Sequence, residues 1–192
     1  MGEESPRQWL LLTYRVPSEP TRFRAYVWRQ VKSLGCLYLQ QAVCLLPMRP
    51  DLDTQFQQLV SKIEEFGGEA TLLTATSRDA EWEAKVVAGF NAMRDEEYAE
   101  IAENEERFED EVRRETRKKK FTFAELEELE ADWEKIGRWM EKVRGRDFFG
   151  APGRQDAEAR LVEGGKLLEE FTRKVYAKQG VEGPTGTEEP AR

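Results

Sequence analysis

The apolar pattern in the N-terminal part of the chain changes from strand-like to helix-like and back, and this order restricts the possible folds more than any other feature. Residues 9–16, WLLLTYRV, form a short apolar and aromatic run that stops at Pro17, which is typical of a buried strand. Residues 18–35, SEPTRFRAYVWRQVKSLG, begin with Ser18, which is suited to capping, and a proline, and they end at Gly35. This pattern predicts a helix directly after the first strand.

The residues that follow repeat this alternation. Residues 36–47, CLYLQQAVCLLP, predict two short strands joined by a tight turn near Gln40 and Gln41. Residues 51–68, DLDTQFQQLVSKIEEFGG, predict a second helix with a Gly-Gly stop, and residues 69–76, EATLLTAT, predict a closing strand. The order β-α-β-β-α-β is that of the ferredoxin-like fold, in which two helices pack on one face of a four-stranded antiparallel sheet.

Long charged helices are expected after residue 76. Within residues 121–149, the apolar side chains are spaced three and four residues apart in alternation, which is the heptad seam of a packed helix. This seam consists of Leu126, Leu129, Trp133, Ile136, Met140 and Val143. The helix starts with a complete capping box, since Thr122 lies three residues before Glu125, with Phe121 and Leu126 as the hydrophobic staple. Similar spacing indicates one helix before it, with Phe90, Met93, Ile101, Phe108 and Val112, and one after it, with Ala157, Leu161, Gly164, Leu168, Phe171 and Val175.

The sequence therefore predicts an α+β protein in three parts. We expect a ferredoxin-like domain over residues 1–78, an antiparallel helical arm of about three helices over residues 79–178, and a disordered tail over residues 179–192. The tail is rich in Gly, Pro and Glu and has no apolar period. Charge is divided in the same way, since the net charge is +1 up to residue 78 and −9 beyond it.

Composition excludes several classes of function. The chain contains no histidine, so Ser-His or Cys-His catalysis and most zinc sites cannot be built from it. Its longest apolar run is far shorter than the roughly 20 residues that a transmembrane helix needs, and it has no signal-peptide pattern, so we expect a cytoplasmic protein that binds no membrane. Cys36 and Cys44 fit a reducing compartment, and we expect them to be small buried hydrophobic residues rather than redox centres. We expect no cofactor and no metal site.

Cations gather in residues 13–32, TYRVPSEPTRFRAYVWRQVK, although the chain has a formal charge of −8. They are Arg15, Arg22, Arg24, Arg29 and Lys32. On the predicted helix, the core stripe consists of Phe23, Val27, Val31 and Leu34, which places Arg22, Arg29 and Lys32 on the opposite side. Guanidinium groups suit oxyanions and phosphates, so the five residues are a candidate anion-binding or nucleic-acid-binding site. The alternative is a solvated helix face, with some of the cations paired to acids of the arm.

Three other groups of residues admit two interpretations. The run RRETRKKK, residues 113–120, either complements the last turns of a helix before the capping box or contacts phosphate. The carboxylates from Asp95 to Glu134 are interpreted as solvated helix faces rather than metal ligands. We expect three tryptophans to anchor a core or an interface rather than to serve as stacking surfaces for bases: Trp28, Trp133 and Trp139.

Four blocks of sequence resemble one known family. Residues 9–47, residues 67–73 (GGEATLL), residues 121–135 (FTFAELEELEADWEK) and residues 146–161 (RDFFGAPGRQDAEARL) closely resemble the N-terminal domain of the chromate-resistance protein ChrB, in the same order. The first half is also similar to the ferredoxin-like module of PaaX repressors and of small CRISPR adaptation nucleases. In those nucleases an aspartate that ends the first strand holds a metal, whereas this chain has Tyr14-Arg15 at that place.

The resemblance implies a bacterial, chromate-responsive regulator of a chromate efflux operon that is not an enzyme. As partners we expect operator DNA or a regulatory partner protein, the chromate oxyanion, and a second copy of the chain in a homodimer. Full-length members of the family continue into a C-terminal domain, which leaves open whether this chain senses and regulates by itself. Two alternatives remain: a helical-arm interaction module without DNA binding, and a degenerate metal-dependent nuclease or chromate reductase.

Overall fold

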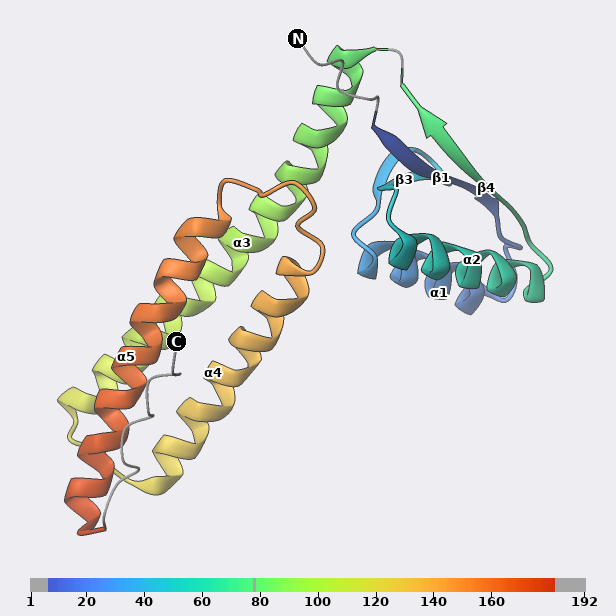
Figure 1. The fold of residues 1–192 in the computed structure, drawn as a ribbon. Helices are drawn as coiled ribbons and strands as arrows, with labels where there is room; N and C mark the ends of the chain where they lie inside the picture. Colours follow the sequence, from blue (N-terminus) through green and yellow to red (C-terminus); the bar gives the residue numbers. More distant parts are fainter. Residues whose placement is uncertain (1–6, 78, 182–192) are drawn as a thin grey trace. The chain divides into compact units, whose positions relative to one another are not determined.

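The computed structural model describes residues 7–77 and 79–181, and its elements follow the predicted order (Figure 1). The first six elements are β1 (Gln8–Arg15), α1 (Thr21–Ser33), β2 (Leu37–Gln40), β3 (Val43–Pro47), α2 (Pro50–Glu65) and β4 (Glu69–Thr76). The strands form one antiparallel sheet in the order β2-β3-β1-β4, and α1 and α2 cover one of its faces (Figure 1). This confirms the α+β class and the β-α-β-β-α-β plan.

Strand β1 lies in the middle of the sheet, and its first half is buried on both faces. Leu11 pairs with Leu45 of β3 on one side and with Leu73 of β4 on the other. Because successive side chains of a strand alternate between faces, Leu10 and Leu12 share one face and are almost fully buried. Val27 and Val31 of α1 are buried in the same core cluster, as the helical stripe predicts. Phe23 and Leu34 of that stripe are half-buried, and the Phe23 ring stacks on Phe66 at 4.1 Å between ring centroids.

Trp9 of β1 belongs to an aromatic cluster that the sequence pattern does not reveal. Its ring lies 6.0 Å from the ring of Phe90 in α3 (Ala80–Arg117) and 6.0 Å from the ring of Phe149, which follows α4 (Phe123–Arg144). Trp82, near the start of α3, meets the Trp9 ring edge-on at 6.3 Å. The start of α3 and the segment Arg146–Ala151 thus form part of the first compact unit. The sequence predicts that Phe90 belongs to a helix of the arm. It does lie in that helix, α3, but near its start, where the Phe90 ring packs against Trp9 of β1.

The chain forms two compact units. The first contains the described residues up to Met93 together with Arg146–Ala151, and the second contains Arg94–Gly145 and the described residues from Pro152 onward. Helix α3 therefore contributes to both units. The predicted domain boundary after residue 78 stays a prediction.

The start of α1 differs from the prediction. Ser18 does not cap the helix, which begins at Thr21 with Pro20 in the cap position at φ −73° and ψ 143° and with no side-chain cap. Proline disfavours the helical conformation in the residue before it, so the helix cannot begin as early as Glu19. The other end is as predicted, because Gly35 has φ 75° and its amide donates to the Lys32 carbonyl at 3.0 Å.

The second unit is an antiparallel helical arm. It consists of the rest of α3, of α4 (Phe123–Arg144) and of α5 (Arg154–Gln179), and successive helices run in opposite directions (Figure 1). The predicted seam of α4 is buried at Leu126, Leu129, Ile136, Met140 and Val143. One half of the capping box is confirmed, since the Thr122 hydroxyl accepts a hydrogen bond from the Glu125 amide at 3.3 Å. The reciprocal bond is replaced, because the Thr122 amide donates to the Lys120 carbonyl and the Glu125 carboxylate pairs with the Lys120 ammonium group. None of the helices in residues 7–77 and 79–181 combines the length and apolar character needed to span a membrane.

Helix α5 ends one residue later than the predicted arm. Its last residue is Gln179, and Gly180 follows in the left-handed conformation at φ 67°. Residues 182–192 of the predicted tail lie outside the described residues.

Trp133 of α4 packs against a glycine of α5. Its ring lies 4.8 Å from the ring of Phe108 in α3 and reaches the backbone of α5 at Gly164. A Cβ atom at Gly164 would come within 2.6 Å of the Trp133 ring, whereas one at Gly165 would lie 3.7 Å away. Gly164 therefore permits a close approach of α4 and α5 that a larger residue would prevent.

Glu105 of α3 is a carboxylate buried inside the arm. Its side chain is 0% exposed, and neither carboxylate oxygen has a hydrogen-bond partner among the described residues. Its pKa is raised from 4.5 to about 7, chiefly by burial; Arg160 lowers the pKa, and Glu109 and Asp156 raise it. The Arg160 guanidinium donates to Asp156 at 3.1 Å, so its charge is already paired. The prediction that these carboxylates form solvated faces is therefore wrong for Glu105.

The contact between Trp133 and α5 can be tested with two neighbouring glycines. We expect Gly164→Ala to lower the free energy of unfolding by ~1–2 kcal/mol, because the clash outweighs the gain in helix propensity. Gly165→Ala should raise it by ~0.5–1 kcal/mol, because this site has room for a methyl group. Urea unfolding of both variants measures the difference. Equal effects at the two positions would contradict the close packing of Trp133 on Gly164.

The buried Glu105 should make stability depend on pH. Its folded pKa lies above that of the unfolded chain, so the folded state binds more protons between 4.5 and 7 and the free energy of unfolding falls as pH rises through this window. We expect Glu105→Gln to stabilise the protein by ~1–3 kcal/mol at about pH 8 and hardly at all at about pH 5. Urea unfolding at the two pH values measures this, with Glu103→Gln on the exposed side of α3 as the control. A gain of equal size at both pH values would rule out titration of Glu105 as its cause.

Candidate functional site

The structure separates the five predicted cations into three places. Arg22, Arg29 and Lys32 are exposed on the side of α1 away from the core, and we call these three residues the outer face of α1. Arg24 borders a pocket beside the same helix. Arg15 lies at the end of β1 and also lines this pocket, but its guanidinium is held in an ion pair. The five residues therefore do not form one cluster.

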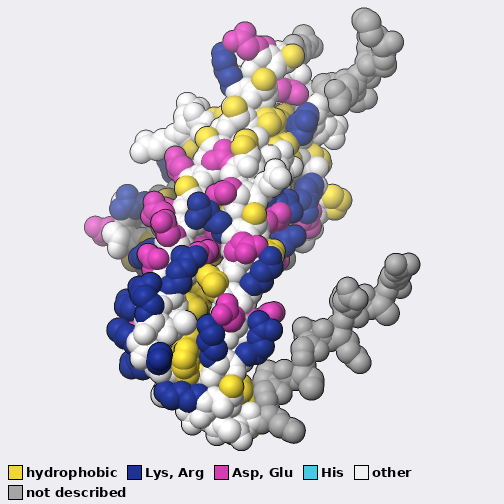
Figure 2. Space-filling model, turned by 90° about the vertical axis from the view of Figure 1, so that its left-hand side faces the viewer, with side chains coloured by type: hydrophobic (Ala, Val, Ile, Leu, Met, Phe, Trp, Pro, Cys, Tyr) yellow, Lys and Arg dark blue, Asp and Glu magenta, His cyan; other side chains and the backbone are white. Residues whose placement is uncertain are grey.

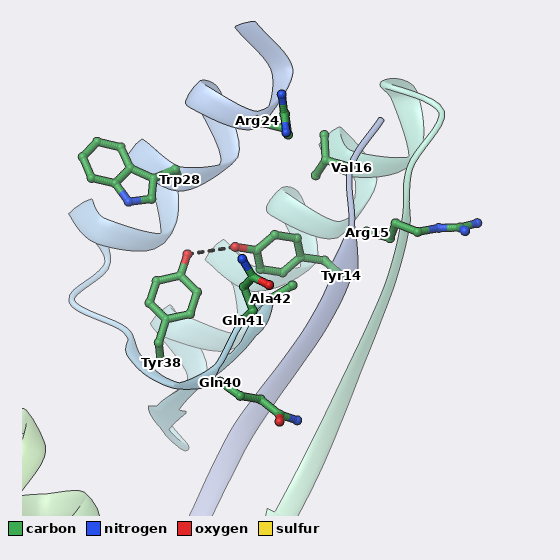
Figure 3. Close-up of a pocket in the computed structure, with 9 residues that line it drawn as sticks. All are labelled: Tyr14, Arg15, Val16, Arg24, Trp28, Tyr38, Gln40, Gln41 and Ala42. Carbon is green, nitrogen blue, oxygen red and sulfur yellow. Dashed lines mark hydrogen bonds between the residues drawn. The ribbon is translucent and has the colours of Figure 1, made fainter. Parts of the chain in front are cut away.

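The pocket beside α1 is open to solvent and has a volume of about 580 Å³. It is lined by Tyr14, Arg15, Val16, Arg24, Trp28, Tyr38, Gln40, Gln41 and Ala42 (Figure 3). We call it the Trp28 pocket. The end of β1, the middle of α1 and the turn between β2 and β3 meet here. That turn is centred on Gln41 and Ala42, one residue later than predicted, and Ala42 has φ 60°.

Two tyrosine hydroxyls meet inside the Trp28 pocket. The oxygens of Tyr14 and Tyr38 lie 2.8 Å apart and are hydrogen-bonded (Figure 3). Burial raises the pKa of both phenols, and the hydrogen bond between them lowers the pKa of Tyr14 and raises that of Tyr38. Both phenols therefore stay protonated at neutral pH. Because their hydrogen bond uses one of the two hydroxyl hydrogens, the other remains able to donate to a bound group.

Trp28 presents its indole ring to solvent at the pocket. The residue is 54% exposed and is not part of the core. Lys32 lies over it, with Nζ 5.3 Å from the ring centroid. Arg24 lies one helical turn before Trp28 and therefore on the same side of α1. Neither Arg24 nor Arg29 forms an ion pair or a hydrogen bond through its side chain with any residue that the structure describes.

Arg15 is occupied by a different contact. Its guanidinium donates to Glu69 of β4 at 2.6 Å, and the side chain points away from the Tyr14 and Tyr38 hydroxyls (Figure 3). Both side chains of this ion pair are largely exposed, at 78% and 74%, so it contributes little to stability. Arg15 thus has a partner in the sheet, and not an acid of the arm.

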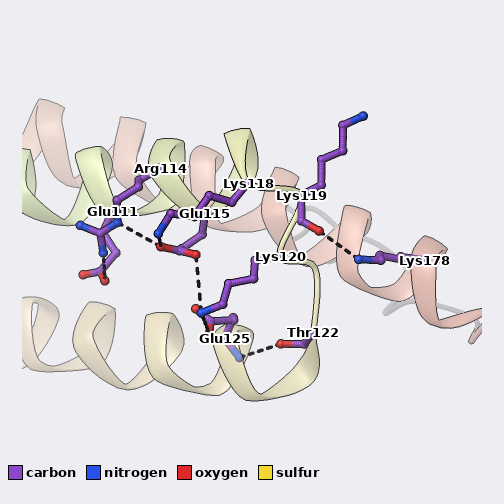
Figure 4. A network of polar contacts seen from close by, with 9 residues as sticks. All are labelled: Glu111, Arg114, Glu115, Lys118, Lys119, Lys120, Thr122, Glu125 and Lys178. Atoms are coloured by element: carbon purple, nitrogen blue, oxygen red, sulfur yellow. Dashed lines mark hydrogen bonds and ion pairs between the residues drawn. The ribbon is translucent and has the colours of Figure 1, made fainter.

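The run at residues 113–120 lies where the sequence predicts, in the last turns of α3 and the turn before α4 (Figure 4). Its centre is Glu115, whose carboxylate is buried and accepts hydrogen bonds from Arg114 and Lys118 at 3.0 Å each. Lys120 approaches the same carboxylate at 3.8 Å and also pairs with Glu125 of the capping box. Three cations of the run therefore hold this helical turn together. The burial of Glu115 is a second departure from the predicted solvated faces.

A second hollow, with a volume of about 290 Å³, lies between α3 and α5 near this turn. Its apolar floor includes Val112, Leu167 and Phe171, and its rim includes the cations Arg113, Arg117 and Lys174. Figure 2 shows hydrophobic side chains lying between Lys and Arg side chains on this part of the arm. We call it the basic groove of the arm. Arg113 and Lys174 pair with glutamates of their own helices at 2.6 Å each, whereas Arg117 has no ion pair within the described part of the chain.

The cysteines and carboxylates were the remaining candidates for redox or metal chemistry. Cys36 and Cys44 are buried free thiols, as predicted. Across residues 7–77 and 79–181, no three His, Cys, Asp or Glu side chains lie close enough together to hold a metal ion.

Comparison with known proteins identifies the family. The family model described as Protein ChrB, N-terminal, matches residues 24–182. The chain belongs to this family. Protein ChrB of Cupriavidus metallidurans strain CH34 is 29% identical over 153 residues, which cover 80% of this chain and 43% of that relative. The chain thus spans less than half the length of the curated relative. No solved structure matches it.

The match to the ChrB N-terminal family includes most of the candidate site. It begins at Arg24 and contains Trp28, Tyr38 and the turn after β2, but not Tyr14, Arg15 or Val16. The predicted likeness to PaaX repressors and CRISPR adaptation nucleases stays a prediction. The sequence does not reveal the Trp28 pocket, because the walls of the pocket come from three separate segments. The one local signal was a tryptophan one helical turn after an arginine at the border of the apolar stripe.

The network around Glu115 predicts a specific loss of stability. We expect Glu115→Gln to lower the thermal midpoint more than Glu111→Gln, because a buried carboxylate that pairs with several cations is lost. Hydrogen bonds from Lys118 and Arg114 lower the Glu115 pKa below its usual 4.5, so its contribution is present at neutral pH and disappears as pH falls through the lowered pKa. Thermal melts of both variants at neutral and strongly acidic pH measure this. A deficit that persists undiminished in strong acid would contradict the ionic role of Glu115.

Proposed function

We propose that this chain is a regulatory module in chromate resistance that binds operator DNA through the outer face of α1. The observation that carries the proposal is membership of the ChrB N-terminal family over residues 24–182. That resemblance implies a chromate-responsive regulator of an efflux operon. Because the chain spans 43% of the relative, both operator binding and the chromate response are part of the proposal.

The distribution of charge supports the outer face of α1 as the DNA contact. The whole chain carries −8, so DNA is repelled by most of its surface and can be attracted only where cations gather. Arg22, Arg29 and Lys32 are exposed on one side of one helix. Lysine and arginine contacts to phosphates position a protein on DNA and supply most of the salt-dependent affinity. We infer that this helix lies against the DNA backbone in a homodimer, which pairs two such helices with two half-sites.

We further propose a binding role in the cytoplasm rather than a catalytic role. The sequence contains no histidine. Tyr14 and Arg15 stand at the end of β1, where the nucleases that the first half resembles have a metal-holding aspartate. In the proposed role chromate acts as an effector, an oxyanion that guanidinium groups are suited to bind.

The basic groove of the arm favours a second candidate function. Its apolar floor and cationic rim suit an acidic, partly apolar segment of a partner protein. In this alternative the chain docks a regulatory partner and does not contact DNA.

The DNA-binding proposal predicts the effect of two arginine substitutions. Arg22→Ala and Arg29→Ala should each weaken binding to the promoter of a chromate-transporter gene from the same genome by ~5–30-fold, because each removes one charged contact to phosphate. Each should also reduce the slope of log affinity against log salt by about one unit for the lost contact. Gel-shift titrations over a range of salt, with and without chromate, measure both effects.

Lys166→Ala is the matched control for this experiment, because it removes an exposed charge from α5 of the arm. It should change neither affinity nor salt slope, and none of the three substitutions should change the thermal midpoint. The proposal would be overturned if the affinity depended on neither the DNA sequence nor chromate, or if neither arginine substitution weakened binding. If the chain binds no DNA at all, the result supports the second candidate function, docking of a regulatory partner.

A further inference from the structure

The Trp28 pocket contains aromatic surface that the core does not use. Trp28 is 54% exposed and Tyr38 is 38% exposed, and both line the pocket. Large aromatic side chains are usually buried, and those that remain exposed beside a hollow offer stacking surface to a ligand. Lys32 lies over Trp28, but one ammonium group covers at most one of the two faces of the indole ring. Trp28 can therefore stack on a planar ring.

The same pocket contains a cation with no partner. Arg24 lies on the same side of α1 as Trp28, and its guanidinium has no ion pair within the described residues. A guanidinium group presents parallel N–H donors that fit the oxygens of a phosphate. An apolar ligand would leave this charge unused, and a bare oxyanion would leave the aromatic surface unused.

Neutral polar groups complete the pocket. The Tyr14 and Tyr38 hydroxyls bond to each other and leave one hydrogen able to donate, and the Gln41 carboxamide lies beside them (Figure 3). A carboxamide offers both a donor and an acceptor, which is the combination that the edge of a nucleobase requires. The volume of about 580 Å³ lies within the range of small-molecule sites.

We propose that the Trp28 pocket is a nucleotide-binding site, in which the base stacks on Trp28, its edge bonds the Tyr14–Tyr38 pair and Gln41, and its phosphate pairs with Arg24. This inference goes beyond the proposed contact with operator DNA and does not rest on it. The ligand chemistry is a nucleoside phosphate, which is supplied either by a free nucleotide or by an unpaired nucleotide in a single strand. Stacking tolerates different bases, so the preference for one base is set by the polar groups.

Binding is tested with the full chain by calorimetric titration of the four nucleoside monophosphates, of the corresponding nucleosides, of inorganic phosphate, and of short single-stranded DNA. We expect at least one monophosphate or the single strand to bind, and the nucleoside and phosphate to bind ~10-fold or more weakly, since each makes half of the contacts. Tighter binding of the single strand identifies an unpaired base as the natural ligand, and tighter binding of the monophosphate identifies a free nucleotide.

Substitutions then assign the contacts. Trp28→Ala and Arg24→Gln should each reduce affinity by ~10-fold or more, whereas Trp28→Phe should retain part of it because a stacking ring remains. Lys85→Gln is the matched control, because it removes an exposed cation of α3 that belongs neither to the pocket nor to the outer face of α1; it should not change nucleotide affinity. Thermal melts confirm that each variant is folded.

Three results would overturn the inference: no binding of any monophosphate or single strand at millimolar concentration, affinity unchanged by both Trp28→Ala and Arg24→Gln, or inorganic phosphate binding as tightly as the monophosphates. The outcome is separable from that of the operator experiment. Substitutions of Arg22 and Arg29 test duplex binding by the outer face of α1, whereas substitutions of Trp28 and Arg24 test nucleotide binding in the pocket.

Discussion

Strand β1 is paired at both edges and its first half is buried from both faces, and the rest of the first unit depends on this constraint. β3 and β4 pair with its two edges, Leu10 and Leu12 fill the core under α1 and α2, and Trp9 stacks against Phe90 on the other face. A strand that is buried on both faces needs cover from both sides. The start of α3 and the segment Arg146–Ala151 provide the second cover. The end of β1 then places Tyr14 where its hydroxyl meets Tyr38, so the candidate site is a consequence of how β1 is packed.

Charges in this acidic chain are used in two different ways. In the arm, cations near the end of α3 are tied to the buried Glu115 and to the capping box of α4, and their contribution is structural. On α1 they are available, since Arg24 and Arg29 have no ion pairs within the described residues. Burial of a carboxylate with several cations is favourable only if they stay paired, whereas exposed unpaired cations cost little and remain free to bind anions. Sequence composition alone does not distinguish these two groups.

Helix α1 presents two separate surfaces because of its periodicity. Residues four apart, such as Arg24 and Trp28, lie on one side and border the pocket, whereas Arg22 and Arg29 lie about a quarter of a turn or more away, on the outer face. The proposed contact with operator DNA uses the outer face, and the proposed nucleotide site uses the pocket. The two functions therefore depend on different side chains of one helix and can be examined one at a time. The family match covers both surfaces except for four residues that precede it: Tyr14, Arg15, Val16 and Arg22.

Local sequence is enough to predict the order of the elements, the Thr122 cap of α4, the glycine stop at Gly35 and the apolar seam of α4. These features depend on residues within a few positions of one another, and short-range chemistry and periodicity suffice to predict them. Other features require contacts between distant segments. They are the cations without ion pairs and the buried Glu105 without a hydrogen-bond partner among the described residues, the contact of Phe149 with Trp9, and the hydrogen bond between Tyr14 and Tyr38, which are 24 residues apart. Those outcomes depend on strand register and on helix packing between distant segments. A one-residue change of register would turn Tyr14 to the opposite face of the sheet, and nothing in the local pattern around Tyr14 specifies which residue of a distant strand it will face.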